Sequence, residues 1–407
     1  MSEVIKLNYN VANDNGNSKV AMVITNGDKE DVIIQPNIYS MDEPVIKTFS
    51  EPETYIPNIL DTLWVNINSP VVQSSNASLY VGKNAYSSSS IHGLKIKGDK
   101  KYEQELPLIS TLSILAGYAV KDAYEKTKKV PTTIKLNIEM STNLPVMEWN
   151  NESQKIYTER FTNNTHTVQV NLGTHVVTVT IKFDFVTCIP ESLAANYAVV
   201  LDSKGDYRND SIFDEVKKQY KISDFTGKNI FTAKQNLMID IGDGTTDLGA
   251  TTGYTPNLKH SDGEKYGVGH AISNALKPFS TRANLKRVAR QKFMEYVQDP
   301  TNKYHEDAID ELKKASRDQI LKISDFVSEH LDDMDNEADH LIVFGGGSIQ
   351  LKDGLYDNLL KIAEKSRSKL VWVDKKHAVT LNAHGLNNYM KLYHESLKKK
   401  QKATVKN

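Results

Sequence analysis

The chain has 407 residues, of which 39% are hydrophobic and 25% are charged. Its 50 Lys and Arg residues nearly balance 51 Asp and Glu residues, which gives a formal net charge of −1. This length and composition predict two or three globular domains and exclude wholesale disorder. The nearly neutral net charge argues against a protein that binds nucleic acid over its whole surface. The single cysteine, Cys188, excludes an internal disulfide and a cysteine-based zinc site.

The first forty residues have the pattern of strands joined by tight turns. Residues 4–11 alternate, and an apolar run at 20–24 follows the polar segment 13–18. Asn and Gly tolerate positive φ, so the sequence DNG between two apolar runs predicts a β-hairpin. Residues 35–100 are rich in Pro, Asn and Ser, which predicts a small subdomain.

Strand and helix patterns continue through the rest of the chain. Apolar spacing predicts a helix over 106–126, and alternation predicts a strand over 133–140 and two strand-like runs within 154–188. Pro190 precedes a helix of small residues over 191–201. The second half repeats this plan, with strands at 236–241, 340–344 and 369–373 and helices at 268–298, 304–334, 354–366 and 378–397.

Three loops rich in Gly, Ser, Thr and Asp follow apolar strands, at 14–18, 240–247 and 345–348. Glycine lets backbone N–H groups approach a phosphate closely, and hydroxyl groups add donors. An Asp at a strand end suits Mg²⁺, which uses few protein carboxylates. The first two loops share the form Asp-x-Gly about one domain apart, which predicts two similar domains that each offer a phosphate-binding hairpin to one nucleotide. No GxxxxGK[ST] occurs, so the chain has no P-loop.

Each loop also has a structural interpretation. DNG occurs in many hairpin turns, and the glycines at 345–347 can serve a close strand-to-helix connection. The segment 240–247 is harder to explain in this way, because a buried strand runs directly into acids, glycines and threonines. The 11 histidines show no HExxH spacing, so a metal enzyme of that type is not expected.

The order of these loops resembles the actin superfamily, over nearly the whole chain. The segments 14–18, 240–247 and 345–348 are similar to its two phosphate loops and its adenosine loop, and 188–192 and 383–385 to its connecting elements. The resemblance implies an α/β, actin-like fold: two ribonuclease-H-like lobes around a central nucleotide cleft, each with a smaller appended subdomain.

The same resemblance implies domain boundaries. Residues 1–188 would form domain I, with a subdomain inserted at about 30–100. Residues 189–382 would form domain II, with a helical subdomain inserted at about 260–337. Residues 383–407 would be a C-terminal helix that returns to domain I, followed by a basic tail. The segment 203–236 is longer than in ParM, which predicts an inserted helix.

Within the superfamily, the chain is most similar to the ParM-type plasmid-segregation actins. YVGKNA at 80–85, NLPV at 143–146 and PES at 190–192 resemble motifs of that group. The resemblance implies an ATPase that binds ATP, or GTP, with Mg²⁺, and that forms filaments whose dynamics depend on hydrolysis. It further implies plasmid segregation through a ParR-type centromere-binding adaptor, with DNA contacted only indirectly. The N-terminus lacks an apolar signal segment and no apolar run is long enough to span a membrane, so we expect a cytoplasmic protein without a membrane role.

The resemblance also implies residue roles. Asp240 would hold Mg²⁺, mostly through water and with the help of Asp14, and Glu191 would orient or activate the attacking water. An acid in a first helical turn is also favoured by the helix dipole, which is the structural interpretation of Glu191. The other implied nucleotide contacts, besides Asp14, are Gly16, Asn17, Ser18, Lys19, Gly242, Asp243, Gly244, Thr245, Thr246, Gly345, Gly346, Gly347 and Ser348.

One position departs from the family pattern. Family members place a Lys seven positions after the first Asp, where this chain has Ala21, and Lys19 comes two positions earlier. A cation such as Lys286 or Arg290 is a further candidate to flank the adenine.

Other functions remain open from the residues alone. The main alternative is a non-polymerising phosphotransferase of the same superfamily, of the sugar kinase or exopolyphosphatase type. A kinase would need a substrate-side general base, and we identify none. An Hsp70-like chaperone would need a β-rich domain after Gly385, and a binding protein without turnover is a third possibility.

Overall fold

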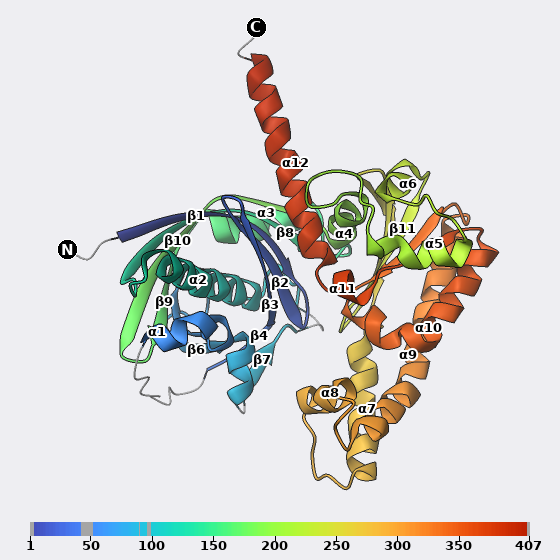
Figure 1. Ribbon diagram of the computed structural model, residues 1–407, viewed down its shortest axis with the longest axis horizontal. Helices are drawn as coiled ribbons and strands as arrows, with labels where there is room; N and C mark the ends of the chain where they lie inside the picture. Colours follow the sequence, from blue (N-terminus) through green and yellow to red (C-terminus); the bar gives the residue numbers. More distant parts are fainter. Residues whose placement is uncertain (1–3, 42–51, 89, 96–98, 405–407) are drawn as a thin grey trace. The chain divides into compact units, whose positions relative to one another are not determined.

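The structure is a computed structural model that describes residues 4–41, 52–88, 90–95 and 99–404, with only the backbone described at 52, 53 and 398–404 (Figure 1). The chain divides into two compact units. Unit 1 comprises Met1–Leu144, Glu148–Ala194 and Ala383–Asn407, and unit 2 comprises Pro145–Met147 and Ala195–Asn382. Two boundaries therefore fall inside helices, in α4 (Glu191–Val200) and α12 (Leu381–Thr404). The side chains of the basic tail after 397 lie outside the described residues.

In the described part of unit 1, ten strands form one sheet in the order β3-β2-β1-β8-β10-β9-β5-β6-β4-β7. The strands are β1 (Val4–Asn15), β2 (Lys19–Asn26), β3 (Lys29–Pro36), β4 (Ile38–Ser40), β5 (Trp64–Asn68), β6 (Ser78–Val81), β7 (Ile91–Gly93), β8 (Thr133–Leu144), β9 (Thr165–Leu172) and β10 (His175–Pro190). β1, β2 and β3 are antiparallel neighbours, whereas β8 runs parallel to both β1 and β10. The hairpin predicted around DNG is therefore confirmed.

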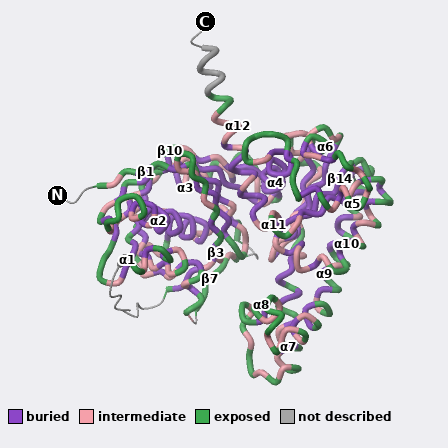
Figure 2. Tube along the Cα trace, in the orientation of Figure 1, coloured by how far each residue is buried: buried purple, intermediate pink, exposed green. Residues whose placement is uncertain are grey.

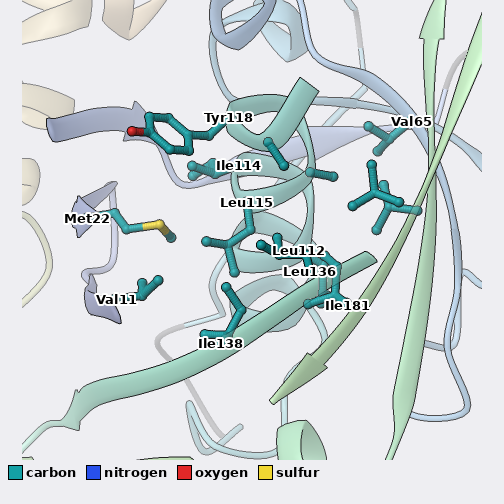
Figure 3. Packing of buried hydrophobic residues seen from close by; sticks show 14 of the residues in the cluster. Val11, Met22, Val65, Leu112, Ile114, Leu115, Tyr118, Leu136, Ile138 and Ile181 are labelled. Carbon is teal, nitrogen blue, oxygen red and sulfur yellow. The ribbon is translucent and has the colours of Figure 1, made fainter. Parts of the chain in front are cut away.

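Helix α2 (Leu106–Thr127) lies at the centre of the unit 1 core. Pro107 stands in its first turn, where the missing N–H is not needed, and the helix ends at Lys128 in the left-handed conformation. Figure 3 shows side chains of α2 among side chains of the sheet, including Val11, Met22, Val65, Leu112, Ile114, Leu115, Leu136, Ile138 and Ile181. This packing supports β1 and β2 on either side of the turn that joins them. The other helical segments of unit 1 are α1 (Pro52–Tyr55), η1 (Ile56–Asp61), η2 (Gly82–Ser87) and α3 (Asn151–Thr162).

The described part of unit 2 contains a five-stranded sheet in the order β13-β12-β11-β14-β15. Its strands are β11 (Asn236–Ile241), β12 (Thr246–Thr252), β13 (Thr255–Glu264), β14 (His340–Phe344) and β15 (Lys369–Trp372). Its helical segments include η3 (Ser211–Phe213), α5 (Asp214–Tyr220), α6 (Gly227–Thr232), α7 (Val268–Arg282), α8 (Arg290–Gln298), α9 (His305–Asp333), α10 (Gly346–Lys365) and α11 (Lys375–Ala378). All five residues of β14 are buried, as Figure 2 shows for this strand. A fully buried parallel strand explains the unbroken apolar run there.

The two sheets share one strand order. In each, three antiparallel strands form a meander, and two further strands run parallel to the first strand of that meander: β3-β2-β1-β8-β10 and β13-β12-β11-β14-β15. The first turn of each meander contains an Asp-x-Gly loop. The two sheets therefore agree with the prediction of two similar domains.

Some local predictions were wrong. The helix expected over 268–298 is two helices, because Asn284 adopts a left-handed conformation after α7 ends. Residues 151–162 form helix α3, which starts with a capping box between Asn150 and Ser153 that the strand prediction overlooked. Helix α10 begins at Gly346 instead of 354, with a kink at Asp353 and Gly354.

Within the described residues, no helix combines the length and the apolar character that a membrane crossing requires.

Candidate functional site

Asn37 holds the first Asp-x-Gly turn of unit 1 in place. Its side-chain amide donates to the Asn15 side-chain oxygen at 2.6 Å and to the Gly16 carbonyl at 2.7 Å, and its backbone N–H donates to the Ser18 carbonyl at 2.9 Å. The Asn37 side-chain oxygen accepts from the Ser110 hydroxyl at 2.7 Å, and Asn37 is fully buried. Two carbonyls of the turn are thus directed to Asn37.

The N–H groups of the same turn remain available. Among the described residues, the backbone N–H groups of Asn17 and Ser18 have no hydrogen-bond acceptor. Successive N–H groups without protein acceptors in a turn form a concave anion-binding arrangement. Lys19, next along, is exposed and forms no ion pair within the described part of the chain, and Ala21 is buried opposite Asp14 in the ladder.

Asp14 and Glu191 are the acidic candidates of unit 1. The Asn143 side-chain amide, from the end of β8, donates to the Asp14 carboxylate at 2.9 Å. Glu191 begins helix α4, and its Oε1 accepts from Lys101 Nζ at 2.9 Å. Burial lowers the pKa of Lys101, but the negative charges of Glu191 and Asp14 outweigh burial and raise that pKa above its usual range.

The second Asp-x-Gly turn, in unit 2, has a closely similar geometry. A Cβ on Gly242 would lie 3.3 Å from the Thr245 carbonyl oxygen, as one on Gly16 would lie 3.0 Å from the Lys19 carbonyl oxygen. The three carbonyls of the turn are directed to the start of α7: those of Gly242, Asp243 and Gly244 accept from the N–H groups of Val268, Gly269 and Gly267 at 3.2, 2.7 and 3.2 Å. In the described chain, the N–H groups of Asp243 and Gly244 have no acceptor. These positions correspond to Asn17 and Ser18.

Polar side chains of the second turn bond to unit 2 itself. Asp243 forms an ion pair with Arg290, at the start of α8. The Thr245 hydroxyl donates to Asp247 at 2.8 Å, and the Thr246 hydroxyl donates to the Tyr266 carbonyl at 3.2 Å. The structure therefore pairs Asp243 with Arg290, whereas sequence analysis considered Asp243 as a nucleotide contact and Arg290 as a residue beside the adenine.

The loop 345–348 joins β14 to α10 beside Asp240. Gly345 has φ +90°, and a Cβ there would lie 2.4 Å from Asp240 Oδ1. A Cβ on Gly347 would lie 2.7 Å from the Gly242 carbonyl oxygen, so close packing explains both glycines. Gly346 differs, because a Cβ there would meet nothing within 4 Å. The Ser348 side chain is fully buried and donates to the Gly345 carbonyl at 2.8 Å, so it stabilises the loop.

Asp240 accepts a hydrogen bond from the side-chain amide of Asn382 at 3.0 Å, at the start of α12. The described residues contain no group of three or more His, Cys, Asp or Glu side chains that could hold a metal ion. Mg²⁺ bound with nucleotide phosphates needs only one or two carboxylates and keeps several waters. A single half-buried carboxylate in each unit fits that mode of binding and does not fit a metal cage made by protein alone.

The comparisons with known proteins bear on the fold. Residues 238–357 match the family model described as "Archaeal actin homologue MreB-like, C-terminal". Among solved structures, the actin-like protein Alp7A matches 100% of this chain over 100% of its own, with a TM-score of 0.69 and 17% identity. The chain has the actin fold. The predicted fold class is therefore confirmed.

Two further structures with this actin fold have similar scores. A Bacillus thuringiensis ParM with ATP matches 95% of this chain over 99% of its own, with a TM-score of 0.62 and 17% identity. The archaeal actin homologue Ta0583 matches 94% of this chain over 99% of its own, with a TM-score of 0.62 and 17% identity. A search of curated proteins by sequence found no significant match.

The actin fold of this chain includes four polar residues that sequence analysis did not assign to the site. Asn37 lies in the weakly patterned region, Lys101 lies in a polar segment before α2, and Asn143 and Asn382 each contact an acidic candidate. Asn143 and Asn382 lie within or beside motifs that were noted for the resemblance, so their position could have drawn attention. Nothing in the pattern around Lys101 pointed to Glu191.

Proposed function

We propose that this chain is an actin-fold ATPase that binds ATP with Mg²⁺, forms filaments in the ATP state and hydrolyses ATP to control their dynamics. The observation that carries the proposal is the repeated turn. In each unit, an Asp-x-Gly turn follows an Asp that accepts from an Asn amide, and it directs its carbonyls into the protein. Two successive N–H groups of each turn have no acceptor among the described residues. N–H groups presented in this way suit phosphate oxygens.

The site residues have separate tasks in this proposal. The N–H groups of Asn17, Ser18, Asp243 and Gly244 bind phosphate oxygens. Mg²⁺ would neutralise phosphate charge when bound, and the carboxylates of Asp14 and Asp240 would hold it, mostly through water. Gly346 allows the adenosine to approach the start of α10, because no protein atom lies where its side chain would be. Glu191 orients the attacking water and accepts its proton.

The filament and its cellular role rest on similarity. ParM and Alp7A match nearly the whole chain, and one similar structure is described as a non-polymerisable quadruple mutant of a ParM. Other similar structures are described as a ParM with ATP, AMPPNP or ADP. Filament growth needs a head-to-tail contact that does not close into a ring. We propose that such filaments move plasmid DNA through a ParR-type adaptor.

The test combines assembly with turnover. Light scattering and pelleting are measured with ATP, GTP, ADP or a non-hydrolysable analogue, with and without Mg²⁺, alongside phosphate release. We expect triphosphate- and Mg²⁺-dependent scattering that decays as phosphate is released. Phosphate release without any scattering at high protein concentration would contradict filament formation and favour a phosphotransferase. The absence of both would contradict the proposed ATPase.

A further inference from the structure

We propose that Lys101 is the positioning residue of the hydrolytic centre: it holds the Glu191 carboxylate ionised and oriented for the attacking water. This inference rests on the proposed ATPase function. No pattern in the sequence marks Lys101, which lies in the polar turn that precedes α2.

Lys101 is fixed at both its backbone and its side-chain end. Its backbone N–H donates to Glu148 Oε2 at 2.8 Å, and its Nζ donates to Glu191 Oε1 at 2.9 Å. Only 5% of the Lys101 side chain and 11% of the Glu191 side chain are exposed. The pair is therefore removed from solvent.

The burial of this pair distinguishes it from the surface ion pairs of unit 1. Lys83 and Asp61 lie as close, at 2.8 Å, but their side chains are 52% and 50% exposed. Exposed ion pairs of that kind contribute little to stability. Two buried charges are costly to remove from water, and removal of one leaves the other buried without a compensating charge. The negative charge of Asp14 also raises the pKa of Lys101.

The contact with Lys101 leaves the second carboxylate oxygen of Glu191, Oε2, available for the attacking water. Lys101 occupies Oε1, and the described residues provide no hydrogen-bond donor to Oε2. In hydrolysis, the water oxygen forms a bond to the terminal phosphorus, the bond from that phosphorus to the diphosphate oxygen breaks, and Glu191 accepts the proton released by the water. A carboxylate that is kept ionised and fixed by Lys101 is ready for this transfer.

The test is a double-mutant cycle with Lys101→Met, Glu191→Gln and the double variant. The measurements are kcat for phosphate release, KM, and the Kd of a fluorescent ATP analogue. We expect Lys101→Met to lower kcat by about 10- to 100-fold with little change in Kd, because general-base catalysis contributes about 100- to 10,000-fold and loss of a positioning residue removes only part of it. In the Glu191→Gln background, Lys101→Met should cause no further loss. Lys83→Met is the matched control and should behave like wild type.

The outcomes separate this inference from the proposed function. Wild-type kcat in Lys101→Met, an additional loss in the double variant, or a loss confined to Kd would overturn the role of Lys101 while the ATPase stands. Absence of nucleotide binding and hydrolysis in wild type would overturn both. Lys101→Met leaves an unpaired buried carboxylate and can unfold, but the double variant removes both charges. Even then, a further loss of kcat in the double variant relative to Glu191→Gln would overturn the role of Lys101.

Discussion

Asn143 donates a hydrogen bond from its side-chain amide to the carboxylate of Asp14 at 2.9 Å, and Asn382 does the same for Asp240 at 3.0 Å. In both Asn side chains, the amide oxygen is buried without a hydrogen-bond partner in the described structure. The donors come from unrelated elements, the end of β8 in unit 1 and the start of α12 in unit 2. Each unit thus fixes its Asp in the same way, although the sequence around the two Asn residues differs.

Removal of either Asn donor should weaken binding of the magnesium nucleotide. Asn143→Ala or Asn382→Ala deletes a hydrogen bond to a charged group, which contributes about 1.5 to 3 kcal/mol. We expect a larger loss of ATP affinity with Mg²⁺ than without it, because the Asp carboxylates are proposed to face the metal's waters. Titration with a fluorescent ATP analogue checks this. Asn84→Ala, which removes a hydrogen bond from a side-chain amide to the Leu63 carbonyl, is the control. An equal loss of affinity in that variant would contradict a specific role of Asn143 and Asn382.

Replacement of Asn37 should disorder the first turn. Asn37→Ala removes the donor to the Gly16 carbonyl and to the Asn15 side-chain oxygen and leaves the Ser110 hydroxyl without its acceptor. Each lost buried bond costs about 1 to 3 kcal/mol, so we expect reduced stability and weaker nucleotide binding together. Ser110→Ala removes only the hydrogen bond from the Ser110 hydroxyl to the Asn37 side-chain oxygen. It should therefore reduce both stability and nucleotide affinity less than Asn37→Ala does. Urea denaturation and nucleotide titration provide the comparison, and unchanged affinity in Asn37→Ala would show that the turn does not bind the nucleotide.

Gly346 and Gly347 should respond differently to the same small change. A Cβ at Gly347 would lie 2.7 Å from the Gly242 carbonyl oxygen, so Gly347→Ala should destabilise the fold. A Cβ at Gly346 would meet no protein atom within 4 Å, so Gly346→Ala should fold normally. We expect Gly346→Ala to lower nucleotide affinity because the methyl group occupies space left for the adenosine. Thermal melting and nucleotide titration test both, and wild-type affinity in Gly346→Ala would refute the assigned contact.

The sequence predicted the fold because the informative features are local. Apolar runs that end in Asp-x-Gly are visible without a structure, and their order along the chain was enough to indicate the actin fold. Helix α3 and the break between α7 and α8 were missed, since the capping box of Asn150 and Ser153 and the left-handed Asn284 are signals of only one or two residues.

The supports of the site could not be predicted in the same way. Asn37 and Lys101 contact residues that are 21 and 90 positions away in the chain, so their partners depend on tertiary packing. An isolated Asn or Lys in a polar segment is most often exposed. Asn37 and Lys101 are instead buried, and only the structure shows this. The loops themselves therefore had a sequence signature, whereas the residues that fix their carbonyls and carboxylates did not.

His340 should make unit 2 sensitive to mild acid. It lies in β14, where its Nδ1 is 2.8 Å from the Asn236 side-chain oxygen, and burial lowers its pKa from 6.5 to about 4 against the opposing charge of Asp339. The unfolded chain therefore binds a proton more readily than the folded chain. The stabilisation is fully present above pH 6.5 and is lost as the pH falls from 6.5 towards 4, by about 1.4 kcal/mol at pH 5.5.

The variant His340→Asn tests this dependence, because its amide can still donate to Asn236 but does not titrate. We expect the free energy of unfolding of wild type to fall between pH 7.5 and 5.5 by about 1.4 kcal/mol more than that of His340→Asn. Urea denaturation is followed by the fluorescence of Trp372, in the adjacent strand β15, in a background where Trp64 and Trp149 of unit 1 are replaced by Phe, so that the signal reports on unit 2. His270→Asn, at an exposed position of α7, should keep the wild-type difference. An identical pH dependence in wild type and His340→Asn would show that His340 is not protonated on unfolding in this range.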